Sequence, residues 1–350
     1  MERNFSRRNL LQVGLGAAAL AALSTPPNAL GAARYKWRMQ THWPTGVGYY
    51  KPLYEGFCNL VKQASGGQIE ITPLPSGAIV PTKDVFEAVG RGVFEICWSF
   101  PAYWIGKVPV AGHFNGQPFG WENFEETLTY FYQMGGMDII RKAYGEHGLY
   151  PLAPQAVSGI TLYSKKPIKT IEDFKGLKVR STGIVAEVFK KAGATPVFFP
   201  GEELYQALQT GVCDAAHWGS TSAGWDMRFQ EVTKYIIKPF LANITNCEVF
   251  VNLNVWNKLP SDLKAVIEHA AMWNAAMSMA WFTYYDNVRA KEFEDKKMGK
   301  VVWMTDDTVK KLRTYSMEVV DEYSKKDPKY CAPAAKLLKD LLQMAGRLNP

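Results

Sequence analysis

The stretch FKGLKVRSTG, residues 174–183, combines a short strand with a turn. Apolar Leu177 and Val179 alternate with charged residues, which is the period of a β-strand that buries one face. The small residues that follow Arg180 suit a turn. The stretch therefore predicts a strand that ends in an arginine. That arginine is either a solvated surface charge or a planar cation presented to an anion.

Strands and helices alternate on both sides of this stretch. The predicted elements are helices at 184–192 and 202–210, strands at 195–199 and 213–218, and an extended segment at 150–163. Together with the strand that ends at Arg180, they give the order β-α-β-α-β. This order is typical of an α/β lobe with a largely parallel sheet.

A unit with the same order lies nearer the N-terminus. Its predicted elements are strands at 35–41, 68–73 and 94–99 and helices at 49–65 and 83–91. Thr82 is expected to be the N-cap of the second helix. A later alternating segment, 248–255, is expected to return the chain to this first lobe.

Two extended segments, 150–163 and 248–255, therefore join two α/β lobes, and a cleft is expected between the lobes. Ligands favour such clefts and the carboxyl ends of parallel strands, where Arg180 is predicted to lie. From Ser261 onward the chain is expected to be helical. Residues 306–348 have the pattern of long amphipathic helices, which serve as a packing or partner surface.

The N-terminus has the pattern of a bacterial export signal. Paired arginines and leucines in Ser6–Leu11 precede an apolar run, 13–23, that is too short to span a bilayer comfortably, and small residues follow up to Ala33. The arginine pair favours the twin-arginine route, with cleavage near 31–33 and a periplasmic product. An ordinary secretory signal with a chance arginine pair, or a permanent anchor, are the alternatives.

Charge and cysteine content exclude several classes of protein. Removing residues 1–33 takes away three arginines and one glutamate, so the formal charge falls from +7 to +5. This mild excess suits small anions and does not require nucleic acid. The five cysteines have wide spacings without a CxxC or Cys/His metal pattern, so most are expected to be buried thiols. One disulfide is compatible with the periplasm, but the sequence does not choose the pair.

Several further stretches carry a family resemblance. FKGLKVR at 174–180, PGEELYQALQTGVCDA at 200–215 and PLPSGAIVPTKDVFEAVGRGVFEI at 73–96 resemble segments of DctP-type solute receptors. These receptors serve tripartite ATP-independent periplasmic (TRAP) transporters. AYWIGKVP, PFG and VNLNVWNKLP also fit, and the resemblance covers about residues 35–330. Each motif is weak by itself, but their order and spacing are specific.

The resemblance implies a two-lobed periplasmic-binding-protein fold of the α/β class, with a cleft, two crossing strands and long C-terminal helices. The expected division of the chain is the export signal at 1–33, a first lobe at 34–154 and 248–305, a second lobe at 155–247, and C-terminal helices at 306–350. Within the family, the chain looks most similar to the branch that binds 2-oxo or 2-hydroxy monocarboxylates together with a metal cation.

The resemblance also implies the site residues. Arg180 matches an arginine that grips the substrate carboxylate, as a planar and permanently charged guanidinium does well. Gln155, the backbone carbonyl of Trp218, and Glu248 match three oxygen ligands of the cation. Tyr103 matches a tyrosine that faces the ligand. Gln155 and Glu248 fall on the two crossing segments, so both are expected to reach the cleft.

A count of charges gives a separate argument for the cation. A carboxylate substrate brings −1, Arg180 brings +1 and Glu248 brings −1, and a cation removes the remaining repulsion. Sodium and calcium both satisfy this count. Two alternatives stay open at this stage: Glu248 pairs directly with Arg180, or Gln155 is an ordinary polar residue of a strand.

One segment departs from the branch. After Trp218, the 2-oxo-acid branch has a bulkier run, whereas this chain has the small residues 219–224. Small residues there leave more room or let the loop fold differently. We therefore expect a substrate larger than pyruvate, such as a branched or aryl acid. Its side chain would contact aromatic residues, unless these belong to the core: Trp43, Phe100, Tyr103 and Trp225.

These observations predict a receptor, not an enzyme. The sequence has no nucleophile elbow, phosphate-binding loop or dinucleotide fingerprint, and its five histidines have no ligand spacing. The expected partners are a small organic acid and the TRAP permease subunits, with a homodimer formed through residues 306–348. The alternatives are a cation-independent receptor for a dicarboxylate or sugar acid, an exported enzyme, and a sensory domain.

Overall fold

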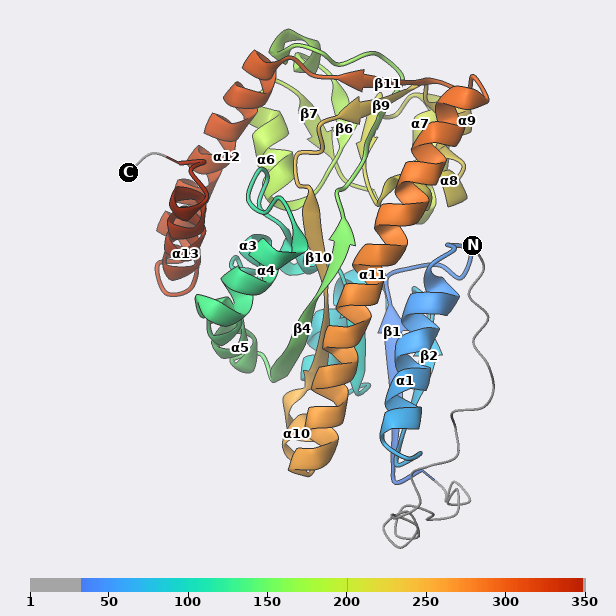
Figure 1. The fold of residues 1–350 in the computed structure, drawn as a ribbon, viewed down its shortest axis with the longest axis vertical. Coiled ribbons are helices and arrows are strands. Elements are labelled where there is room, and N and C mark those ends of the chain that lie inside the picture. The colour runs from blue at the N-terminus through green and yellow to red at the C-terminus, as the bar shows by residue number, and fades with distance from the viewer. Residues whose placement is uncertain (1–32, 200, 349–350) are drawn as a thin grey trace, which may run out of the picture.

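The computed structural model describes residues 33–199 and 201–348 of the chain, so nearly all of the predicted export signal lies outside the described residues. Two β-sheets, each covered by helices, lie one above the other (Figure 1). Within the described part, no helix is long and apolar enough to cross a membrane.

The first sheet has the strand order β2-β1-β3-β10-β4. Its strands are β1 (Tyr35–Thr41), β2 (Ile69–Leu74), β3 (Ile96–Ser99), β4 (Leu149–Ser158) and β10 (Ile244–Asn252). β1, β2 and β3 are parallel, as the first predicted β-α-β-α-β unit requires, and β10 is antiparallel to both β3 and β4. The helices of this unit are η1 (Tyr50–Glu55), α1 (Gly56–Ala64), η2 (Thr82–Asp84) and α2 (Val85–Gly90).

The second sheet has the strand order β11-β9-β5-β8-β6-β7. Its strands are β5 (Leu162–Ser164), β6 (Lys178–Arg180), β7 (Thr195–Val197), β8 (Ala215–His217), β9 (Tyr235–Lys238) and β11 (Lys300–Trp303). β6, β7 and β8 are parallel, as predicted. The helices around this sheet are η5 (Ile171–Phe174), α6 (Gly183–Lys191), η6 (Gly201–Glu203), α7 (Leu204–Thr210), α8 (Thr221–Asp226) and α9 (Phe229–Val232).

The two predicted crossings are present. The segment expected at 150–163 consists of β4 in the first sheet and β5 in the second, with residues 159–161 between them. The chain returns through 239–243, which connects β9 to β10. β4 and β10 are antiparallel neighbours: β4 leads toward the second sheet and β10 leads back from it, so they form the connection between the lobes (Figure 1).

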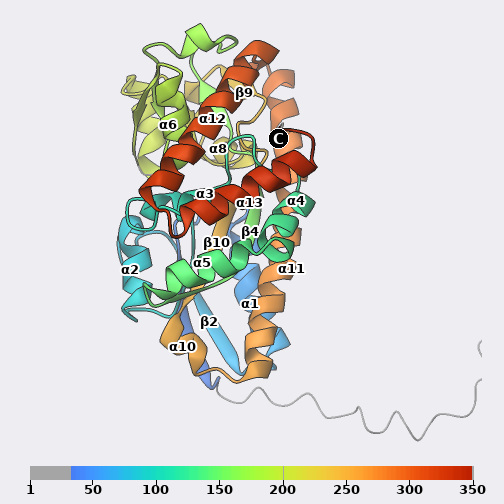
Figure 2. The same cartoon turned by 90° about the vertical axis from the view of Figure 1, so that its left-hand side faces the viewer.

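The remaining helices cover the first sheet and join the lobes. They are η3 (Pro101–Trp104), α3 (Ala111–Asn115), α4 (Phe124–Leu128), η4 (Thr129–Gln133), α5 (Gly136–Gly145), α10 (Leu253–Asn257), α11 (Ser261–Asp295), α12 (Asp306–Lys326) and α13 (Cys331–Met344). α11 extends along both lobes and packs on β4 (Figure 1). α12 packs on α6, and α13 packs on α5 and η4 (Figure 2).

Two expectations about these elements are wrong. The chain after Ser261 is not entirely helical, because β11 forms there and pairs with β9 at the edge of the second sheet. Thr82 is not the N-cap of α2, because it lies in the preceding 3-10 turn and its hydroxyl bonds that of Ser76. The five cysteines are buried and free, as expected for most of them.

Candidate functional site

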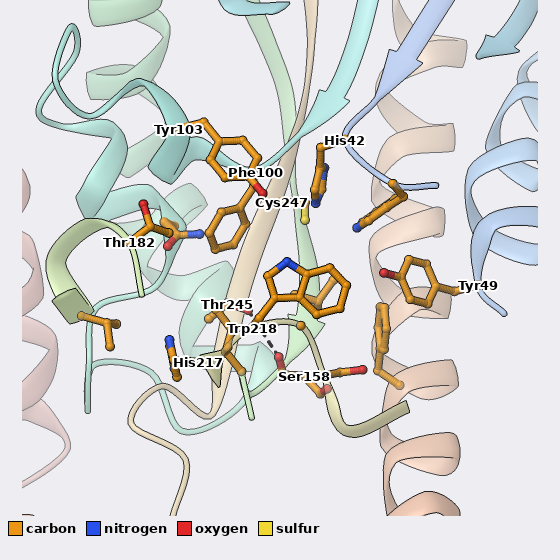
Figure 3. A pocket seen from close by; sticks show the side chains of 18 of the residues that line it. His42, Tyr49, Phe100, Tyr103, Ser158, Thr182, His217, Trp218, Thr245 and Cys247 are labelled. Atoms are coloured by element: carbon orange, nitrogen blue, oxygen red, sulfur yellow. Dashed lines mark hydrogen bonds between the residues drawn. The ribbon is translucent and has the colours of Figure 1, made fainter. Parts of the chain in front are cut away.

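A cavity lies between the two sheets and takes residues from both (Figure 3). It holds about 650 Å³ of space, part of which is open to solvent. The lining residues are His42, Trp43, Tyr49, Phe100, Tyr103, Asn115, Val157, Ser158, Ile160, Arg180, Thr182, Val185, His217, Trp218, Gly219, Ser220, Thr245, Cys247 and Phe282. The sequence-predicted cleft therefore exists, and Arg180 lines it.

The carboxyl ends of four parallel strands supply the polar side of this cavity. His42 follows β1, Tyr103 lies in η3 after β3, Arg180 ends β6, and Trp218 follows β8. Parallel strands end at the same edge of their sheet, so residues far apart in the chain meet there. The crossing strands β4 and β10 contribute the floor, including Ser158 and Thr245.

Arg180 is held by the ends of the strands on either side of β6. Its Nε donates to the carbonyl of Phe199, 3.0 Å away, and its Nη1 donates to the carbonyl of His217, 3.2 Å away. The guanidinium carbon lies 5.4 Å from the centre of the Phe198 ring, within reach of a cation–π contact. These contacts fix the plane of the guanidinium before any ligand arrives.

One nitrogen of this guanidinium, Nη2, makes no hydrogen bond within the described part of the chain. Arg180 is 2% exposed, and among the described residues its Nη2 has no hydrogen-bond partner. Leaving a buried charged donor unpaired is costly, so such a group indicates the position of a missing partner. A carboxylate is the partner whose geometry matches this group best.

Two histidines line the same cavity. His42 Nδ1 and His217 Nε2 are buried and have no partner among the described residues. Burial lowers the pKa of both imidazoles to about 3, and the charge of Arg180 contributes to this shift. Both imidazoles are therefore neutral near pH 7, and each offers one nitrogen to a ligand.

Tyr103 lies where the resemblance placed it. The side chain points into the cavity beside Phe100 and His42 (Figure 3). Burial raises the pKa of the hydroxyl, and the positive charge of Arg180 offsets part of that rise. Tyr103 and Arg180 therefore line the same cavity.

Gln155 does not reach the cavity. It lies on β4 opposite Cys247, is fully buried, and faces α11. Its Nε2 donates to the carbonyl of Ala271, 2.9 Å away, and its Oε1 accepts from Nδ2 of Asn274 at 3.2 Å. Its amide therefore connects β4 to α11.

Glu248 points the other way. In the antiparallel pair β4–β10 it lies opposite Pro154, one position from the Gln155–Cys247 pair, so its side chain leaves the other face of the sheet. Tyr144 donates its hydroxyl to Oε1 of Glu248 at 2.6 Å. Burial raises the pKa of this carboxyl to about 8. The expectation that Gln155 and Glu248 both reach the cleft is thus corrected, and Glu248 does not pair with Arg180.

The segment after Trp218 folds into the start of α8. Ser220 caps this helix by accepting from the backbone N–H of Ala223. Gly224 packs against Tyr163, and a Cβ at that position would overlap the ring. The small residues of 219–224 are therefore explained partly by packing, while Gly219 and Ser220 also line the cavity.

Three of the four aromatic residues predicted to contact the ligand line the cavity: Trp43, Phe100 and Tyr103. Trp225 does not line it, and Arg289 instead lies over its ring at 5.2 Å from the centre. A second, outer cavity shares His42, Tyr103 and Trp218 with the first and leads toward the surface. It contains one basic and one acidic side chain, Lys83 and Glu202.

The sequence did not predict His42, His217, Ser158 or Thr245 as lining residues. The rule that placed Arg180 applies equally to His42, which directly follows the predicted strand 35–41. Ser158 carried no comparable signal, because its side chain is placed by a contact far along the chain. Its hydroxyl donates to Asp286 of α11, whose other oxygen accepts from the backbone N–H of Ser222 at 2.7 Å.

A family model, curated relatives and solved structures all place the chain among the solute-binding proteins. The family model of the bacterial extracellular solute-binding proteins, family 7 (DctP), matches residues 39–327. A monocarboxylate 2-oxoacid-binding periplasmic protein of Nostoc sp. is 28% identical over 332 residues, which cover 92% of this chain and 90% of that protein.

Two solved TRAP transporter solute-binding proteins have the same fold. The one from Bordetella bronchiseptica, described with calcium and picolinate, has a TM-score of 0.84 and 25% identity, covering 90% of this chain and 94% of that one. The one from Pseudoalteromonas atlantica, described with sodium and pyruvate, has a TM-score of 0.82 and 26% identity, covering 89% and 95%.

Proposed function

The chain belongs to family 7 of the bacterial extracellular solute-binding proteins, and we propose that it is the receptor of a TRAP transporter for a 2-oxo or 2-hydroxy monocarboxylate. The DctP-type resemblance and the two-lobed α/β fold predicted from the sequence are confirmed. In this proposal the acid binds in the cavity between the sheets, and the liganded receptor delivers it to the membrane permease.

The observation that carries the proposal is the buried Nη2 of Arg180, which has no partner among the described residues and lies in a cavity with Arg180 as its one guanidinium and several aromatic side chains in its lining. A carboxylate accepts from this group, while the carbonyls of Phe199 and His217 keep the guanidinium in place. The name of the Nostoc relative supports the same ligand class.

The charge of the cavity favours an acid with one carboxylate. Arg180 is the only lysine or arginine among the lining residues, and a second carboxylate would have no basic partner there. This supports the monocarboxylate over the alternative of a dicarboxylate. For the acid's side chain, the aromatic wall and the adjoining outer cavity support a group larger than the methyl of pyruvate.

One relative is described with bound calcium and picolinate and another with bound sodium and pyruvate, which is consistent with the expected metal cation. Of the three ligands expected in this chain, Trp218 lines the cavity, whereas Gln155 and Glu248 have other partners. The predicted ligand set is therefore not assembled here, and the proposed binding step relies on Arg180.

The family and the matched structures are solute-binding proteins, which supports a receptor without catalytic activity. The Nostoc relative is named as periplasmic, which supports the predicted periplasmic location and the permease as partner. The division into lobes at 34–154 with 248–305 and at 155–247 stays a prediction, as does the twin-arginine signal.

A homodimer through residues 306–348 also stays a prediction. In the single chain, α12 and α13 already pack on α6 and α5, so a dimer by exchange would re-form these contacts between subunits. Sedimentation analysis of the protein without its signal decides the matter: a mass of one chain contradicts the homodimer.

Thermal unfolding with a panel of acids tests the proposed function. The panel contains 2-oxo and 2-hydroxy monocarboxylates of increasing size, dicarboxylates and sugar acids, and the protein is first freed of bound ligand. A ligand at a hundred times its Kd adds about 2.7 kcal/mol of stability, which gives a clear shift in Tm. A response confined to dicarboxylates or sugar acids, or no response at all, contradicts the proposal.

A further inference from the structure

We propose that this chain binds its monocarboxylate without a bound cation, using Arg180 and hydrogen bonds alone. The inference rests on the function proposed above, and it concerns the difference between this chain and the relatives described with calcium or sodium.

The charges of the cavity balance with the acid alone. The sequence-based charge count placed the Glu248 carboxylate beside the acid, but no aspartate or glutamate is among the residues that line the cavity. The acid brings −1 and Arg180 brings +1, so the pair is balanced without a metal ion. In the outer cavity, Lys83 and Glu202 carry opposite charges, so they leave no net charge there either.

The two side chains expected to ligate the cation are held elsewhere by geometry. Gln155 uses its amide in two hydrogen bonds to α11, and turning it into the cavity would leave the carbonyl of Ala271 and the amide of Asn274 without these bonds. Glu248 leaves the opposite face of the same pair of strands. A side chain cannot change faces without a one-residue shift of the whole strand.

Glu248 is also the acceptor at the end of a chain of two buried hydrogen bonds. The indole N–H of Trp104 donates to the hydroxyl of Tyr144 at 2.6 Å, and that hydroxyl donates to Glu248 at 2.6 Å. Trp104 and Tyr144 are both fully buried in the core of the first lobe. The carboxyl of Glu248 is therefore part of that core, and it does not line the cavity where it could bind a cation.

In the described part of the chain, no other carboxylate replaces Glu248 as a ligand in the cavity. Asp286 lies behind Ser158, but both of its oxygens already accept hydrogen bonds, from the Ser158 hydroxyl and the Ser222 N–H. Asp226 accepts from the backbone N–H of Gly48 at 2.8 Å. Over residues 33–199 and 201–348, no group of three or more His, Cys, Asp or Glu side chains is arranged to hold a metal ion.

The lining residues have three buried side-chain atoms without a partner among the described residues, and none of them is a ligand for a hard cation. They are nitrogens on Arg180, His42 and His217, whereas sodium and calcium take oxygen ligands. The guanidinium N–H instead donates to a carboxylate oxygen, and a neutral imidazole nitrogen donates to a 2-oxo oxygen or accepts from a 2-hydroxyl group, according to its tautomer. The free groups therefore suit the acid itself.

Calorimetric titration in three buffers tests the inference. The protein without its signal is dialysed against chelator and placed in choline chloride with chelator, in sodium chloride, and in choline chloride with calcium. Each sample is titrated with pyruvate, 4-methyl-2-oxopentanoate and phenylpyruvate. We expect the Kd of each acid that binds to differ by less than about tenfold among the buffers.

The outcomes separate the inference from the proposed function. A Kd that is weaker by about tenfold or more in chelator, and is restored by sodium or calcium, overturns the inference and leaves the monocarboxylate receptor intact. If none of a wider set of monocarboxylates binds in any buffer, the proposed function fails and the inference fails with it. Metal analysis of the liganded protein after dialysis should likewise find no stoichiometric calcium.

Discussion

Arg180 combines two roles that are separable by substitution. Its Nε and Nη1 donate to backbone carbonyls at the strand ends around β6, and in the proposed function its Nη2, which has no partner among the described residues, donates to the acid. Arg180→Lys keeps the charge but loses the planar fork, so we expect the acid to bind about ten- to a hundredfold more weakly. Arg180→Met removes the charge, and we expect no measurable binding. Calorimetric titration of the acid measures both.

Arg141→Lys is the matched control for this substitution. Arg141 also donates to backbone carbonyls and contacts a ring, that of Tyr150, but it is not among the residues that line the cavity. Its replacement should leave acid affinity unchanged. Unchanged affinity in Arg180→Met, with the unliganded protein still folded by thermal unfolding, would contradict the role given to Arg180.

Glu248 makes a prediction about stability and pH. Burial raises the pKa of its carboxyl from 4.5 to about 8, so the folded state favours the protonated form. The free energy of unfolding therefore falls as pH rises from 4.5 to 8, by at most about 1.4 kcal/mol per unit from this group. Glu248→Gln removes that loss. The variant should match the wild type near pH 4.5 and exceed it at pH 8.

Urea unfolding at a series of pH values measures the difference for Glu248→Gln. The wild type at pH 4.5 is the internal control, because its carboxyl is largely protonated in the folded state there. Parallel pH profiles for the two proteins would show that burial does not raise the pKa of Glu248 as the structure implies.

The sequence located some site residues and not others for a physical reason. Arg180 and Trp218 follow strands that are visible as alternating segments, and their position at a strand end is sufficient to bring them to the cleft. Gln155 and Glu248 lie within long strands, where the face depends on register. In a doubly buried strand such as β10, apolar residues on both faces hide that register.

At the scale of elements, the sequence predicted the two β-α-β-α-β units well. It did not predict the short strand β11, which forms through tertiary contacts. The β-α-β-α-β order of both lobes could be recognised because apolar residues recur at every second position in a strand and at every third or fourth position in the helix that follows. β11 is four residues long and follows a 35-residue helix, and it pairs with β9 at the edge of the second sheet. Its strand character comes from that contact and not from a local pattern.

Gly159 is the residue at which β4 leaves the first sheet, and its lack of a side chain has a packing reason. A Cβ there would overlap the Phe240 ring and lie 2.7 Å from the carbonyl of Ala242, on the segment that returns to β10. Gly159→Ala forces the two crossings apart, and we expect it to cost about 1–3 kcal/mol of stability. Gly46→Ala, with nothing within 4 Å of the new Cβ, should cost little.

Thermal unfolding of the two glycine variants measures this difference. The added Cβ overlaps the connection between the lobes and not the cavity. The loss of stability for Gly159→Ala should therefore appear without ligand. Equal Tm values for the two variants would mean that the crossings separate freely, contrary to the packing of Gly159 against Phe240 and Ala242.

At the scale of the whole molecule, the cavity of the proposed site is lined by residues from both lobes. Arg180 and Trp218 belong to the second sheet, whereas His42 and Tyr103 follow strands of the first. An acid that touches all four groups binds best when the two sheets are close. Binding therefore shifts the population toward the closed arrangement by the difference in contact energy between open and closed forms.

One direct link between the sheets supports that closed arrangement. Asp226 of α8 accepts a hydrogen bond from the backbone N–H of Gly48, in the loop after β1, at 2.8 Å. Asp226→Ala removes this link without touching the residues that line the cavity. A hydrogen bond to a charged group contributes about 1.5–3 kcal/mol, part of which is restored by water in the open form. We therefore expect acid affinity to fall by about three- to tenfold.

Calorimetric titration measures that loss, and small-angle scattering of the unliganded protein measures the accompanying opening. Asp295→Ala is the matched control, because Asp295 is an exposed aspartate whose partner, Lys291, lies on the same helix. We expect Asp226→Ala, and not Asp295→Ala, to raise the radius of gyration without ligand. Saturating acid should then restore the wild-type radius, because the ligand supplies the contacts that the substitution removed. If Asp226→Ala keeps both the wild-type affinity and the wild-type radius, the Asp226–Gly48 link does not hold the lobes together.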